Sequence, residues 1–174
     1  MTVKTGQTTM FNTRIDIDQD KREELVGLIN QQLADTLDLF TQTKQAHWNV
    51  KGLDFFQVHE LLDDLAKTVR KQADMIAERA TALGGVAMGT ARMSAEASTL
   101  PEYPADTFDS PDVLNAVTER YAAYAASTRA AIKRTQELDE PTTEDMFTDV
   151  SREIDEALYF LESHLQGSQP TLKQ

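Results

Sequence analysis

No cysteine occurs among the 174 residues of the chain, which excludes disulfides and any metal site built on thiolates. No apolar run is long enough to span a membrane, and the first residues lack the pattern of a signal peptide. Positive charge is scarce as well: 17 Lys and Arg stand against 29 Asp and Glu, for a formal net charge of −12. A charge of this sign repels nucleic acids and attracts cations. These absences favour a cytoplasmic protein that does not bind membranes.

The alternation typical of β-strands is also missing, and apolar residues recur instead at the three- and four-residue spacing of amphipathic helices. The pattern predicts four long helices: residues 20–49, 55–83, about 110–138, and from the turn at Pro141 to near Gly167. The connection at 84–109 has room for a short helix around 92–98. Fully extended it reaches roughly 85 Å, enough to cross a bundle from end to end. Two short turns and one long crossover indicate an all-α, ferritin-like four-helix bundle.

We predict a single bundle domain at residues 18–167, preceded by a flexible arm at 1–17 and followed by a short tail at 168–174.

The second predicted helix carries four polar residues in a symmetric register. His59 and Asp63 are four residues apart, as are Asp74 and Glu78, and the residue numbers of the outer pair and of the inner pair both add up to 137.

Such a helix, laid antiparallel on its own copy about a two-fold axis near position 68.5, brings His59 level with the partner's Glu78. It also brings Asp63 level with the partner's Asp74. Within one chain the two pairs cannot meet, because 11 residues of helix separate Asp63 from Asp74, or about 16 Å. Each chain therefore holds two half-sites that only a symmetric dimer completes.

His47 joins this set from the preceding helix. Gly52 can end that helix in the left-handed conformation, and Asp54-Phe55-Phe56-Gln57 has the form of a capping box that opens the next one. A short turn of this kind places His47 and His59 at similar height on adjacent helices. Imidazole and carboxylate ligands suit iron, zinc or manganese, and two histidines with three carboxylates suit ferrous iron that must turn over.

Ordinary ion pairs on the helix compete with this interpretation. Asp63 has Lys67 four residues ahead, and Asp74 has Arg70 four residues behind. Such pairs do not explain the two-fold register of the whole set. His164, in the last turn of the fourth predicted helix, has no comparable neighbours and is interpreted as structural. The chain also lacks the Glu-x-x-His motif of a site inside one bundle, which favours a shared site.

Several segments resemble the Dps family of mini-ferritins: Lys44 to Gly52 (KQAHWNVKG), His59-Glu60-x-x-Asp63, Asp74-x-x-x-Glu78-Arg79, Leu83-Gly84-Gly85 and Ser151 to Asp155. The resemblance covers roughly residues 20–166. It implies a hollow, spherical homododecamer of four-helix bundles.

In that family each shared site binds two iron ions, here through His47, His59 and Asp63 of one chain and Asp74 and Glu78 of its two-fold mate. The resemblance implies a ferroxidase that oxidises ferrous iron, preferably with hydrogen peroxide, and stores ferric mineral, which protects against oxidative stress. Zinc is the alternative, non-productive occupant.

The resemblance also gives roles to other residues. Trp48 would form a wall of the site and donate electrons, against the alternative of an aromatic core residue. Glu60 and Asp64 would face the cavity and seed mineral, against the alternative of a solvated acidic face. Four acidic residues would line an iron uptake pore: Asp139, Glu140, Glu144 and Asp145. For the last two, the alternative is charge complementarity with the start of a helix.

Some family members bind DNA through a lysine-rich tail. The arm of this chain carries Lys4 and Arg14 against Asp16, and the C-terminal tail carries only Lys173. Because DNA binding of this kind needs many phosphate contacts, we predict none of consequence at physiological salt. The alternative function, a non-enzymatic nucleoid or DNA-protecting cage, is disfavoured for the same reason.

Overall fold

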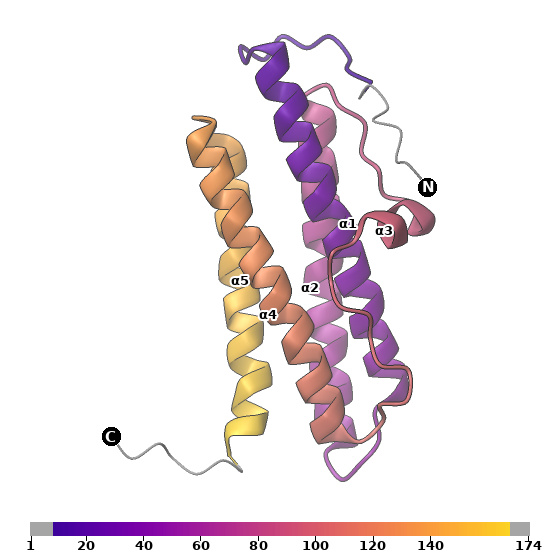
Figure 1. The fold of residues 1–174 in the computed structure, drawn as a ribbon. Helices are drawn as coiled ribbons and strands as arrows, with labels where there is room; N and C mark the ends of the chain where they lie inside the picture. The colour runs from indigo at the N-terminus through magenta and orange to yellow at the C-terminus, as the bar shows by residue number, and fades with distance from the viewer. Residues whose placement is uncertain (1–8, 168–174) are drawn as a thin grey trace, which may run out of the picture.

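The computed structural model of the chain describes residues 9–167 as a bundle of four long helices and one short one (Figure 1). The helices of this region are α1 (Gln19–Asn49), α2 (Phe55–Ala82), α3 (Ala91–Ala97), α4 (Ser110–Glu137) and α5 (Pro141–Gln166). The short α3 lies in the crossover, beside α1. The predicted all-α bundle, with its long crossover between the second and third long helices, is confirmed. Within residues 9–167, no helix is long and apolar enough to cross a membrane.

The core lies between the four long helices. Its largest fully buried side chains come from all of them: Leu25, Ile29, Leu33, Leu39, Leu62, Ile76, Tyr121, Tyr124, Phe147, Ile154 and Leu161. The two tyrosines hydrogen-bond to α1, Tyr124 to Thr36 at 2.6 Å and Tyr121 to Thr43 at 3.3 Å. Burial raises the pKa of both phenols well above the ordinary value, so both stay protonated and fix the register of α4 against α1.

The turn between α1 and α2 is tied to the start of α4. Ser110 donates a hydrogen bond from Oγ to the carbonyl of Lys51 at 2.7 Å, and a Cβ at Gly52 would lie 2.8 Å from that Oγ. Gly52 has a φ of 126°, so glycine meets both demands. The predicted capping box is wrong, because the side chain of Asp54 accepts no hydrogen bond at the start of α2.

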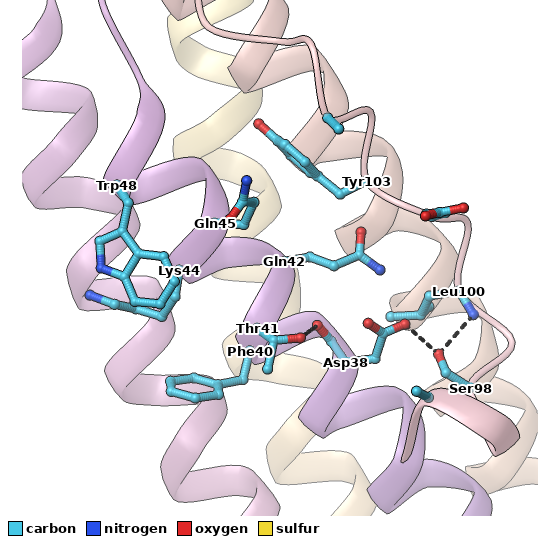
Figure 2. A pocket seen from close by; sticks show the side chains of 13 residues that line it. Asp38, Phe40, Thr41, Gln42, Lys44, Gln45, Trp48, Ser98, Leu100 and Tyr103 are labelled. Carbon is cyan, nitrogen blue, oxygen red and sulfur yellow. Dashed lines mark hydrogen bonds between the residues drawn. The ribbon is translucent and has the colours of Figure 1, made fainter. Parts of the chain in front are cut away.

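The crossover is fastened to α1 by two aspartates. The backbone N–H of Thr99 donates to the buried carboxylate of Asp35 at 2.7 Å. Ser98 donates from Oγ to the carboxylate of Asp38 at 2.6 Å (Figure 2). These bonds hold the middle of the crossover along the bundle, close to the helix that carries His47.

Residues 9–17 belong to the arm predicted as flexible, but they contact the end of α2. The N–H of Phe11 donates to the carbonyl of Gly84 at 2.6 Å, and Arg22 of α1 donates to the carbonyl of Leu83 at 2.9 Å. A Cβ at Gly84, whose φ is 87°, would lie 2.4 Å from the carbonyl oxygen of Phe11. The charges that bear on DNA binding at Lys4 and Lys173 lie outside the described residues.

Candidate metal centre

His47 and His59 form a stacked pair at the α1–α2 turn. Their ring centroids are 3.8 Å apart, and the Nδ1 of each ring lies within hydrogen-bond distance of the other residue's backbone carbonyl, at 2.8 and 2.9 Å. A carbonyl oxygen only accepts, so Nδ1 carries the proton in both rings. Nε2 is then the nitrogen left for a metal in both rings, which is the arrangement of a histidine that binds a metal through Nε2.

Asp63 lies one helical turn beyond His59 and joins this pair. One of its oxygens is 3.8 Å from the Nε2 of His47. His47 is largely buried, whereas His59 and Asp63 are partly exposed, so this side of the cluster is accessible from outside the bundle. The predicted proximity of His47 and His59 is confirmed, because a tight turn after a helix brings flanking positions to the same height.

Both carboxylate oxygens of Asp63 are engaged by lysines. The Nζ of Lys44 lies 2.7 Å from Oδ1, and the Nζ of Lys67 lies 3.0 Å from Oδ2. The hydrogen bond from Lys44, followed by that from Lys67, holds the pKa of Asp63 well below its usual range. The pair with Lys67 is the competing helix pair considered from the sequence, and it does form. A cation that binds Asp63 therefore competes with two ammonium groups.

Lys44 is the residue of this cluster that sequence reasoning missed. Its side chain is 19% exposed, against 67% for Lys67, and its Nζ lies 5.7 Å from the centre of the Trp48 ring. The available signal was its position three residues before His47, which places both on one face of α1.

Asp74 and Glu78 occupy the other half of α2 and are both exposed. Among residues 9–167, neither side chain makes a hydrogen bond or ion pair, and the competing pair between Asp74 and Arg70 does not form. The two halves of the predicted site thus differ in charge: one holds an aspartate with two lysines, and the other holds two free carboxylates.

The chain alone does not bring the five predicted ligands together. Within residues 9–167, no three side chains of His, Asp or Glu gather closely enough to hold a metal ion. Asp63 and Asp74 lie on one continuous helix, so about 16 Å separate them. If the site is shared between two chains, a single chain should hold its ligands in two separate groups. The two-fold contact itself stays a prediction.

Trp48 is not a core residue in the single chain, so the packing interpretation of this side chain is wrong. It is 63% exposed and borders a hollow of about 750 Å³ between α1 and the crossover, with Lys44 beside it (Figure 2).

Glu60 and Asp64 are exposed, and Asp64 pairs with Lys67 at 2.9 Å. Their proposed part in seeding mineral stays a prediction.

Among the four candidates for an uptake pore, Glu140 requires a correction. It is 4% exposed and accepts hydrogen bonds from two backbone N–H groups at the start of α5 and from Arg79, so it is not free to line a pore. Asp139 and Asp145 are exposed, and Glu144 accepts a hydrogen bond from Gln136 at 2.7 Å. His164 is exposed at the end of α5, apart from the other histidines.

Comparisons with known proteins bear on this geometry. The family model of the ferritin-like domain matches residues 26–169. The DNA protection during starvation protein of Agrobacterium fabrum is 42% identical over 154 residues, which cover 88% of this chain and 95% of that protein. The chain belongs to the Dps family of mini-ferritins.

Solved structures of Dps proteins agree with this assignment. DpsA14 from Streptomyces coelicolor superposes with a TM-score of 0.88 at 31% identity, covering 97% of this chain and 100% of that one. An archaeal Dps homologue from Halobacterium salinarum superposes with a TM-score of 0.86 at 26% identity, covering 97% and 93%. Membership in the Dps family supports a role in iron storage or DNA protection.

Proposed function

We propose that this Dps-family chain is a ferroxidase subunit of an iron-storage cage. Ferrous iron is the substrate, and it binds to His47, His59 and Asp63 of one chain together with Asp74 and Glu78 of a two-fold mate. Hydrogen peroxide is the preferred oxidant, and the ferric product is stored as mineral inside a homododecamer. This activity would protect a cytoplasm from the reaction of free ferrous iron with peroxide.

The observation that carries this proposal is the state of the two imidazoles. Each Nδ1 donates to a backbone carbonyl, so Nε2 is the nitrogen available to a metal in both rings, and the Nε2 of His47 lies 3.8 Å from the carboxylate of Asp63. A pair of core histidines without a ligand would use Nε2 as well as Nδ1 for hydrogen bonds. A solved Dps protein from Vibrio cholerae is described as a member of the ferritin-like diiron-carboxylate superfamily; at 21% identity it supports the fold, and its description motivates iron as the metal.

The chemistry balances for two iron ions and one peroxide. Two ferrous ions give one electron each, the O–O bond of hydrogen peroxide breaks, and its two oxygen atoms take up two protons from solution to leave as two molecules of water, with two ferric ions as the other product. Because both electrons arrive together, no hydroxyl radical is released. The residues of this chain bind and orient the two ions. The free carboxylates of Asp74 and Glu78 supply the negative charge that a pair of dications needs.

The first test is anaerobic. Ferrous iron is added to metal-free protein, followed by a stoichiometric pulse of hydrogen peroxide, and ferric absorbance is followed while peroxide consumption is measured. We expect fast oxidation of about two irons per peroxide, without hydroxyl radical. The double variant H47A/H59A should lose fast oxidation and keep its assembly, whereas H164A serves as a matched histidine control. Oxidation by H47A/H59A as fast as wild type would refute the assignment of the site.

The shared nature of the site has its own test. The variant H47A/H59A and the variant D74N/E78Q each break every site of a homodimer. In a mixed dimer of the two, one site is intact and the other lacks both halves. Random mixing should therefore restore about a quarter of wild-type activity. If co-assembled variants stay inactive, the site is not shared in this way.

A DNA-protecting function is the second candidate, because several relatives carry that name. The net charge of −12 and the few basic residues near the termini argue against it. We expect no shift of plasmid DNA on a gel in about 150 mM salt without divalent cations. A clear shift under these conditions would favour the second candidate.

A further inference from the structure

Arg79 directly follows the candidate ligand Glu78, but its side chain is held by a different part of the bundle. Its Nε donates to Oγ1 of Thr143 at 2.9 Å, and its Nη2 donates to Oε2 of Glu140 at 3.0 Å. Both partners are buried, and they lie at the start of α5. The end of α2 is thus fastened to the α4–α5 turn through the residue next to Glu78.

Glu140 is fixed in place independently of Arg79. It occupies the N-cap position of α5 and accepts the backbone N–H groups of Thr142 and Thr143 at 3.2 and 2.8 Å. Burial alone would raise the pKa of this carboxyl. The hydrogen bonds from Thr143 and Arg79 outweigh that effect and leave the pKa below its usual value. Arg79 therefore faces a rigid and ionised partner.

A second arginine of the protein shows that such a side chain can reach the carboxylate directly before it. On α4, the Nη1 of Arg120 lies 2.9 Å from the carboxylate of Glu119, and the other partners of Arg120 are the backbone carbonyls of Ala116 and Glu102. Adjacent side chains on a helix point about 100° apart, but the arginine is long enough to close that gap. Glu78 and Arg79 repeat the order of Glu119 and Arg120, yet the carboxylate of Glu78 has no partner within residues 9–167.

We propose that Glu140 is a positioning residue for the iron site: it holds Arg79 away from Glu78 and so keeps the Glu78 carboxylate free for iron. The inference rests on the proposed function for the role of Glu78. It assigns Glu140, which is buried, a task different from lining a pore.

Loss of the charge at Glu140 should free Arg79 to pair with Glu78, and iron must then displace an arginine. Exposed pairs of this kind shift an equilibrium by a factor of roughly two to five. We therefore expect E140Q to bind ferrous iron two- to fivefold more weakly. Its oxidation should show a raised KM and an unchanged kcat at saturating iron, because the ligands themselves are intact.

The decisive variant is the double replacement E140Q/R79Q. It removes the competing cation as well, so it should bind iron as tightly as wild type, although it lacks both members of the buried pair. General damage to the end of α2 predicts the opposite, since the double variant would then be at least as impaired as E140Q. E137Q is the matched control: Glu137 is the last residue of α4, directly before the same turn, and within the described part of the chain its carboxylate pairs with Arg134 alone, at 2.8 Å.

The experiment titrates metal-free, assembled protein with ferrous iron under anaerobic conditions, and then measures KM and kcat with peroxide. Weaker binding by E140Q that R79Q reverses supports the proposal. Wild-type affinity in E140Q, or a loss that R79Q does not reverse, overturns it. The anaerobic affinity decides this point even where no variant oxidises iron, whereas slow oxidation by wild type counts against the proposed function alone.

Discussion

Replacing Lys44 with methionine should tighten the binding of ferrous iron at the candidate site. Lys44 donates to Asp63 at 2.7 Å, and iron has to compete with that contact. Methionine keeps the apolar stem of the side chain and removes the ammonium group. The pKa of Asp63 would rise toward its ordinary value of 3.8, which still leaves the carboxylate ionised at neutral pH. The change therefore removes a competitor without neutralising the ligand.

The exposure of the two lysines sets the size of the effect. Lys67 is 67% exposed, shares its ammonium with Asp64, and can swing into water easily, so K67M should tighten binding by less than about twofold. Lys44 is 19% exposed and packs against Trp48, so it leaves Asp63 less readily. Loss of its charge also relieves repulsion of a dication, and salt screens that part. For K44M we expect a gain of roughly three- to tenfold.

An anaerobic titration of metal-free protein with ferrous iron measures both variants against wild type. The titration should be repeated at two salt concentrations, because the repulsive part of the effect shrinks with ionic strength. Equal affinity of K44M and wild type would refute the reasoning, as would a larger gain in K67M than in K44M. The second outcome would mean that exposure does not decide which lysine obstructs the site.

Two further predictions concern stability. The pKa of Glu140 is lowered in the folded protein, so its pairing stabilises the fold above the ordinary pKa of 4.5, and this contribution is lost as the pH falls below that value. E140Q should accordingly lose less stability than wild type between about pH 5 and pH 3 in thermal unfolding; parallel curves would contradict this. G84A should release the arm at residues 9–17, because Cβ would clash with the carbonyl of Phe11 and a φ of 87° costs about 1–2 kcal/mol. Limited proteolysis of the arm measures the release, and G27A is the control because a Cβ there meets nothing within 4 Å.

The sequence was sufficient to predict the helices almost to the residue. The predicted spans 20–49 and 55–83 compare with Gln19–Asn49 and Phe55–Ala82, and the short helix at 92–98 with Ala91–Ala97. Apolar residues at regular helical spacing run through the long segments, and glycines and prolines mark their ends. The pairing of His47 with His59 was predictable for the same reason, because a short turn leaves few arrangements for flanking residues.

Contacts between segments far apart in the sequence could not be predicted in this way. Glu140 stands among polar and charged residues in the sequence, which is typical of an exposed turn. Only the packing of α2 against α5 shows that Arg79 reaches it. Trp48 is a large aromatic residue of the kind that usually packs in a core. Its position on α1, one residue after His47, instead turns its side chain outward. The role of Lys44 depends on a distance between two helices, which spacing along one helix does not report.

One consequence concerns the division of labour within the chain. All five candidate ligands lie on the hairpin of α1 and α2, residues 19–82, and in the proposed function the two ends of this hairpin serve two different iron centres. The proposed reaction centre would therefore be encoded in a helical hairpin that contains less than half of the chain. The hairpin of α4 and α5 contributes no ligand to it. An evolving chain could thus alter most of α4 and α5 to change the shape or surface of an assembly, provided that the contact of Glu140 and Thr143 with Arg79 is kept.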